Sequence, residues 1–167
     1  MFEQRFLSGI LCTALIDFRA QAIEDHDNII FRFSDIFHNV PPQLLNEEEA
    51  AKGYAWVLHA EPVWVENQRE QFIQQFSGLE PVENKRKYLA FLLQAVLADF
   101  KAYGETTGNK PLYRLSHLLR DIPLNLLSPD SARSEYMRLM EKFKEHKVER
   151  WLENRKQEYY DQYNEFI

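Results

Sequence analysis

The chain has 167 residues, of which 45% are apolar and 28% are charged, and its formal net charge is −6. This length suits one compact domain or two small ones, and this composition is ordinary for a soluble globular protein. The negative charge disfavours non-specific binding to nucleic acid, because an acidic surface repels phosphate groups, and it favours a basic protein as the partner.

The single cysteine, Cys12, excludes an internal disulfide, so the cysteine count does not require an oxidising compartment. The N-terminus leads directly into charged residues, without the basic and then apolar pattern of a secretion signal. In the sequence we find no apolar stretch that approaches the roughly 20 residues of a membrane span. These features predict a cytoplasmic protein that does not interact with a membrane.

Apolar residues recur with helical spacing from the N-terminus onward and predict a helix over about residues 3–24. Polar residues follow, and a short helix is predicted over about 28–38. Pro41 ends this second helix and suits the first turn of a third one, which we place over about 42–60. Pro62 separates the third helix from a fourth.

The same series returns 82 positions later. The segment from Arg5 to Ala20 aligns without a gap on the segment from Lys87 to Ala102. After five extra residues in the second copy, Trp64 aligns with Trp151 at an offset of 87. Self-similarity at a fixed offset is typical of proteins built from repeated structural units.

This repeat predicts an all-α fold, a helical bundle built from two tandem, duplicated helical modules. The modules are residues 1–80 and 81–167, and we expect them to pack together as one globular unit. The second copy has no proline or glycine after Pro129. Its last two helices are therefore predicted to fuse into one long C-terminal helix over about 130–163. The tryptophans at 64 and 151 are predicted to anchor the last helix against the first helix.

Two polar pairs are retained between the copies. Asp17 and Asp99 share one position of the first helix, and Arg32 and Arg114 share one near the start of the second. We predict an ion pair between Asp17 and Arg32 and another between Asp99 and Arg114, across the corner between these helices. Both pairs would have a structural role, which a double-mutant cycle would test.

Candidate catalytic and metal-ligating residues are sparse, because no histidine is retained between the copies. Asp35 and His38 have the spacing of a metal-ligating pair, but a di-metal bundle needs a second such pair, which the sequence lacks. We therefore expect no metal and no cofactor. Arg32 and His38 have the loose spacing of the motif in HEPN-type helical ribonucleases, whereas the second copy carries Arg114 and Arg120 without a histidine.

The segment from Ser34 to Pro41 reads SDIFHNVP and resembles the A/S-D-x-x-H-N-x-P segment of small bacterial all-helical proteins. Some of those proteins are immunity-like proteins that accompany toxins. The resemblance implies an immunity-like role and assigns no binding residue. The second copy departs from it at three positions, His117, Arg120 and Asp121.

These observations predict a protein that is not an enzyme and that binds another protein, in the form of an immunity- or antitoxin-like protein that masks a basic toxin. The predicted contact residues are Glu47, Glu48, Glu49 and His38. The glutamates also fit a structural role, since acidic side chains in the first turn of a helix interact favourably with its dipole.

Two alternative functions stay open. One is a structural or adaptor oligomer, such as a homodimer that uses an aromatic C-terminal tail. The residues of that tail are Tyr159, Tyr160, Tyr163 and Phe166. The other is a ribonuclease that uses Arg32 and His38.

Overall fold

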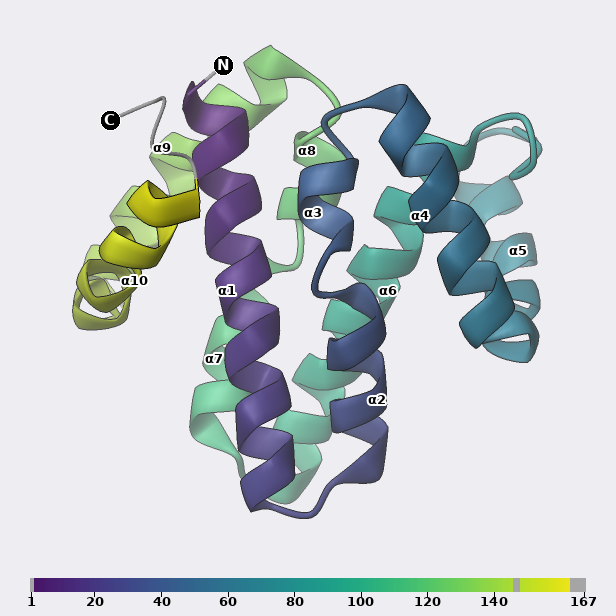
Figure 1. Cartoon of the computed structure of the whole chain (residues 1–167). Coiled ribbons are helices and arrows are strands. Elements are labelled where there is room, and N and C mark those ends of the chain that lie inside the picture. Colours follow the sequence, from purple (N-terminus) through teal and green to yellow (C-terminus); the bar gives the residue numbers. More distant parts are fainter. Residues whose placement is uncertain (1, 146–147, 163–167) are drawn as a thin grey trace.

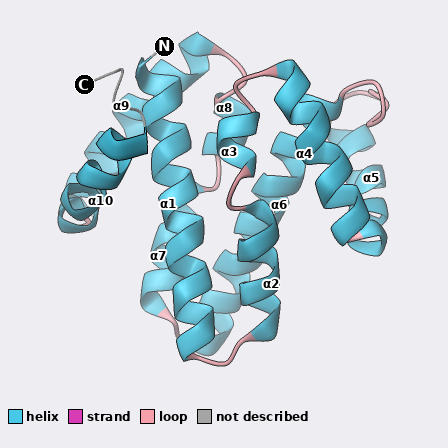
Figure 2. Cartoon of the chain, in the orientation of Figure 1, coloured by secondary structure: helices cyan, strands magenta, loops and turns pink. Residues whose placement is uncertain are grey.

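The computed structural model describes residues 2–145 and 148–162. Every regular element within these ranges is a helix (Figure 2), which confirms the all-α prediction. The N-terminal half contains α1 (Phe2–Glu24), α2 (Asn28–Phe37), α3 (Val40–Gln43), α4 (Glu47–Ala60) and α5 (Pro62–Gln75). The C-terminal half contains α6 (Lys85–Thr107), α7 (Lys110–Leu119), α8 (Ile122–Asn125), α9 (Pro129–Glu145) and α10 (Glu149–Gln162).

Two helix pairs form the centre of the molecule. α1 packs along α2, α6 packs along α7, and the two pairs lie against each other through α1 with α7 and α2 with α6 (Figure 1). The remaining long helices form two flanks. α4 and α5 lie on one side of this centre, and α9 and α10 lie on the other side.

The flanking helices cross from one half to the other. α4 belongs to the N-terminal half, yet it contacts α6 more extensively than any other helix. In the same way, α9 and α10 of the C-terminal half both have α1 as their most extensive neighbour. Each half therefore covers the first long helix of the other half.

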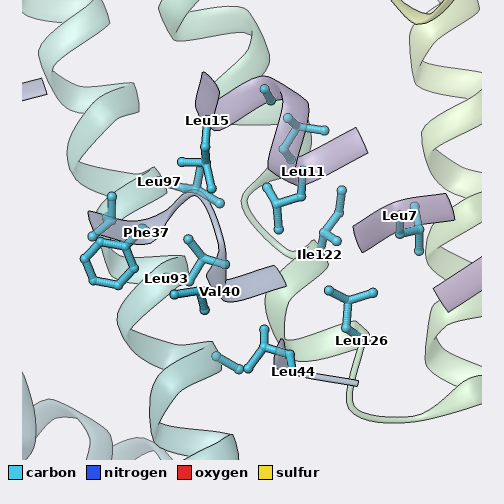
Figure 3. Close-up of a cluster of buried hydrophobic side chains, with 14 of the residues drawn as sticks. Leu7, Leu11, Leu15, Phe37, Val40, Leu44, Leu93, Leu97, Ile122 and Leu126 are labelled. Atoms are coloured by element: carbon cyan, nitrogen blue, oxygen red, sulfur yellow. The ribbon is translucent and has the colours of Figure 1, made fainter. Parts of the chain in front are cut away.

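One continuous hydrophobic core joins all of these helices. Figure 3 shows leucines of both halves in it, including Leu11 and Leu93, which the offset of 82 relates. Phe18 and Phe100 are related by the same offset, and their rings meet edge to face with centroids 5.6 Å apart. Because burial of apolar surface is the dominant stabilising term in folding, this shared core couples the stability of the two halves.

α1 is long and apolar enough to cross a membrane by length and composition alone. One stretch of 18 residues has a mean hydropathy of 1.4, and 67% of that stretch is buried. The prediction that no apolar stretch approaches this length is wrong for α1. Its packing explains the composition: α2, α3, α9 and α10 all contact α1, so most sides of the helix face protein instead of solvent.

The predicted long C-terminal helix is also wrong, because α9 ends at Glu145 and α10 begins at Glu149. The amide of Val148 donates to the carbonyl oxygen of Phe143 at 3.0 Å, a bond that satisfies an end carbonyl of α9. Val148 and Leu152 are buried. Val148 lies outside both helices, and it packs in the same core as Leu152.

The described residues of the C-terminal half include a buried charged side chain. Glu135 of α9 is 4% exposed, and its carboxylate accepts hydrogen bonds from Asn125 Nδ2 at 2.7 Å and from Arg138 Nε at 2.9 Å. The matching position of the N-terminal half is Gly53, where an added Cβ atom would lie 2.0 Å from Gln43 Oε1. The two positions that the offset of 82 relates therefore differ in chemistry.

Candidate functional site

A cluster of polar side chains joins the two halves at the flank of α10. Trp151 and Arg155 stand about one turn apart on α10 and leave the same face of that helix. Trp151 Nε1 donates to Asp17 Oδ2 of α1 at 2.7 Å. Arg155 donates to both carboxylate oxygens, from Nη2 to Oδ1 at 2.6 Å and from Nε to Oδ2 at 3.0 Å. Such a bidentate pair compensates the charge of Asp17 and fixes the orientation of its carboxylate.

The opposite flank has the same tryptophan–aspartate contact in different surroundings. Trp64 of α5 hydrogen-bonds to Asp99 of α6. At an offset of 87, Gln68 stands where the other flank has Arg155, and the ion pairs of the described residues do not join an arginine to Asp99. Burial raises the pKa of the Asp99 carboxyl, and the hydrogen bond from Trp64 opposes this shift only in part.

A pocket of about 310 Å³ opens beside the Asp17 cluster, between α1, α7 and α10. Its lining is mainly apolar, with polar groups from α1. The lining residues are Asp17, Phe18, Ala20, Gln21, Glu24, Pro111, Leu112, Leu115 and Trp151. Glu24 is exposed and forms no ion pair among the described residues, so it brings an uncompensated negative charge to the pocket.

Aromatic rings fill the equivalent place on the opposite flank. The Trp64 ring has its centroid 5.2 Å from that of Phe33 and 5.8 Å from that of Phe37. The offset of 82 places Leu115 and Leu119 at the corresponding positions of the other half. The smaller leucine side chain at position 115 leaves room beside Trp151, and this room is part of the pocket.

The predicted ion pairs are corrected by these contacts. Asp17 pairs with Arg155, and Arg32 pairs with Glu61 instead of Asp17. Asp99 receives its hydrogen bond from Trp64, and the described ion pairs do not include one between Asp99 and Arg114. The physical reason is the crossing of the halves, which brings α10 to α1 and α5 to α6. The tryptophans do contact the first long helices, but each contacts the one of the other half. Trp151 of α10 meets α1, and Trp64 of α5 meets α6.

The predicted contact residues lie in two places. The glutamates at 47, 48 and 49 form the exposed first turn of α4, where Asn46 caps the helix. Glu47 pairs with Arg86 at 3.2 Å, and Lys52 pairs with Glu49 at 3.0 Å, so neighbouring cations offset part of the acidic charge. His38 lies at the end of α2, with Nδ1 2.7 Å from the carbonyl oxygen of Asp35. The described contacts do not join His38 to the three glutamates, and their role in binding stays a prediction.

Candidate catalytic groups do not converge in the described part of the chain. Arg32 and His38 are six positions apart, so their side chains leave a helix in directions about 120° apart. Residues 2–145 and 148–162 hold no group of three His, Cys, Asp or Glu side chains that could bind a metal ion. Cys12 is buried, and this burial, with a smaller effect of Glu158, raises the pKa of its thiol to about 11. A thiol of that pKa stays protonated and weakly nucleophilic at neutral pH.

The aromatic tail divides between the core and the part of the chain that is not described. Tyr159 is fully buried, and its ring lies 4.8 Å from that of Phe6 between centroids. This burial removes Tyr159 from any exposed oligomer interface. Tyr163 and Phe166 lie outside the described residues, as does the side chain of Tyr160.

Two residues that define the site were missed from the sequence. The predictions rested on what the copies share, and both Arg155 and Leu115 are positions where the copies differ. A signal for them was present, since Gln68 aligns with Arg155 and Phe33 aligns with Leu115. A change from an aromatic to a smaller side chain next to a retained tryptophan indicates lost packing on one flank.

Comparison with protein-family models, with curated proteins and with solved structures gives no match for this chain.

Proposed function

We propose that the chain arose by duplication of one helical module and that the two copies, residues 1–80 and 81–167, interlock. Support comes from contacts between the halves that occur twice at related positions. Gln4 Nε2 donates to the carbonyl oxygen of Leu126 at 2.8 Å, and Arg86 Nε donates to that of Leu44. Arg86 is 82 positions after Gln4, and Leu44 is 82 positions before Leu126, so the two contacts join related positions. The tryptophan–aspartate bonds form a second pair of this kind.

On this scaffold, we propose that the protein acts by binding another protein, without catalysis, in the manner of an immunity or antitoxin protein that masks a basic toxin. The observation that carries the proposal is an exposed apolar face on α1, made of Ile16, Ala20 and Ile23. Ile16 is 47% exposed and Ile23 is 53% exposed. Exposed contiguous apolar surface on a soluble protein commonly marks an interaction site.

The C-terminal half does not repeat this α1 face. Its related positions are Ala98, Ala102 and Glu105, so the large apolar side chains are absent there. The scaffold therefore does not require isoleucine at positions 16 and 23. The exposed isoleucines are thus a feature of the N-terminal half, which supports a role of this face in binding.

The surroundings of the α1 face favour a basic partner. Glu24 and Asp25 are exposed at the end of the same helix, and the whole chain has a net charge of −6. Complementary charge accelerates encounter and improves specificity more than it raises affinity. An apolar face beside acidic groups thus fits a partner whose own contact surface is apolar and basic.

Affinity capture from a lysate of the native host tests the proposed function. The bait proteins are the wild type, an Ile16→Asp and Ile23→Asp double variant, and a Val63→Asp control that changes an even more exposed apolar residue of α5. We expect a stoichiometric basic protein on the wild type and on the control, with at least roughly tenfold less on the double variant, because it buries unpaired charge in the interface. Equal capture by all three baits would contradict the proposal.

A further inference from the structure

The pocket beside Trp151 adjoins the α1 face, because Ala20 belongs to both. The two together form a continuous surface that is apolar on α1 and hollowed between α1, α7 and α10. Hot spots of protein interfaces are aromatic side chains that enter such hollows, surrounded by flatter contacts. The position of the pocket therefore suits the centre of an interface.

The size of the pocket selects the kind of occupant. At about 310 Å³ it stands at the lower limit of pockets that hold drug-sized ligands or cofactors. One large side chain suits this space better than a whole cofactor. Its walls are Leu112, Leu115 and Pro111 of α7, with Trp151 opposite, and these favour an aromatic ring that can pack on the indole.

The charge at the pocket favours a cation next to that ring. Asp17 already pairs with Arg155 and with Trp151, so its charge is compensated within the protein. Glu24 forms no ion pair among the described residues and lines the same pocket. A cation close to the bound ring would meet Glu24, whereas an anion would be repelled by it.

We propose that the pocket between α1, α7 and α10 is the anchor site for one aromatic side chain of the protein partner, with a lysine or arginine of that partner beside Glu24. This inference rests on the proposed function and adds where and by what chemistry the partner is held. On the opposite flank, the rings of Phe33 and Phe37 pack against Trp64.

A titration with a minimal mimic tests the pocket directly. The probe is tryptamine, which joins an indole ring to an ammonium group, and its matched control is indole-3-propionate, which carries a carboxylate instead. The readout is the NMR resonance of the indole N–H of Trp151, with that of Trp64 as the internal control. We expect tryptamine to shift the Trp151 resonance with a millimolar Kd. The Kd of the anionic control should be at least about fivefold higher.

Variants locate the probe. Leu115→Phe places in the pocket an aromatic ring like that of Phe33 on the opposite flank, and it should abolish the shift. Ala20→Leu should block the pocket from its exposed side without changing a core residue. Glu24→Gln should remove the preference for the cation. Glu105 is an exposed glutamate near the C-terminal end of α6, as Glu24 is at that of α1. The Glu105→Gln variant should therefore leave the preference for the cation unchanged. An undisturbed Trp64 resonance verifies that each variant is folded.

Four results would overturn the anchor site. The first is an unchanged Trp151 resonance in wild-type protein, and the second is equal affinity for both probes. The third is a partner that the wild type and Leu115→Phe capture equally, which leaves the proposed function intact and removes the pocket from it. Micromolar binding of tryptamine itself would also overturn it, in favour of a small-molecule site. Conversely, a probe that binds while capture does not depend on the α1 face contradicts the proposed function.

Discussion

On one flank of the molecule Trp151 binds Asp17, and on the other flank Trp64 binds Asp99. The first aspartate is held by Arg155 beside an open pocket. The second has Gln68 in that place, and aromatic rings cover its tryptophan. The shared bond belongs to the scaffold of both flanks. The arginine and the described pocket lie on the flank of Trp151, and this difference underlies the proposed anchor site.

The largest expected effect concerns the buried Glu135, which has no counterpart in the N-terminal half. Arg138→Met removes the arginine that compensates this carboxylate. Breaking a buried pair from one side leaves an uncompensated charge, so the free energy of unfolding should fall by about 3 kcal/mol. Urea-induced unfolding measures the change.

The control for Arg138→Met is Trp56→Met, at the matching position of the N-terminal half. Trp56 is 57% exposed, and its replacement should change stability by about 0.5 kcal/mol or less. A loss of similar size in both variants would mean that the buried pair does not distinguish the two halves.

The second effect concerns the two aspartate clusters. Arg155→Leu leaves Asp17 with Trp151 as its remaining donor and should cost about 2 kcal/mol, in the range of hydrogen bonds to charged groups. Gln68→Leu, at the same position of the other flank, should cost about 0.5 kcal/mol or less. Thermal or urea unfolding of both variants measures the difference. Equal losses would refute the inequality between the flanks.

A smaller effect is expected from the start of α4, where α9 of the other half has Pro129, Asp130 and Ser131 instead of three glutamates. Reversing the charges with Glu47→Lys, Glu48→Lys and Glu49→Lys should lower capture of a basic partner by about threefold and weaken its dependence on salt. The reduction is modest because Arg86 and Lys52 already offset part of this charge. Unchanged capture would remove these glutamates from the interface.

The smallest expected effect is a dependence of stability on pH that comes from Asp99. Its pKa is raised in the folded protein, so the folded state binds this proton more tightly than the unfolded chain does. The resulting stability is present at low pH and is lost as the pH rises through the raised pKa. The unfolding free energy of the wild type minus that of Asp99→Asn should therefore fall as the pH increases. A difference that rises with pH would contradict a raised pKa of Asp99 in the folded protein.

The sequence predicted the positions of most helices, because apolar spacing and proline positions are local signals. It placed the first helix over about residues 3–24, and α1 spans Phe2–Glu24. It could not predict which helix each aspartate meets. Asp17 and Arg155 are 138 positions apart, and their contact depends on the crossing of α10 onto α1, which no local pattern records.

The break between α9 and α10 escaped prediction for a related reason. Charged residues of high helical propensity run through this region, and neither proline nor glycine interrupts them. The break coincides with the burial of Val148 and Leu152, and that burial is a property of the assembled core. The pocket likewise depends on what Leu115 faces in the assembled structure.

Separate production of residues 1–80 and 81–167 tests the interlocked duplication most directly. Each half lacks the helices that cover its first long helix, since α4 lies on α6 and α9 lies on α1. We predict that neither half unfolds cooperatively as a monomer, and that an equimolar mixture forms a one-to-one complex with a cooperative unfolding transition. A half that is monomeric and unfolds cooperatively on its own would contradict the account.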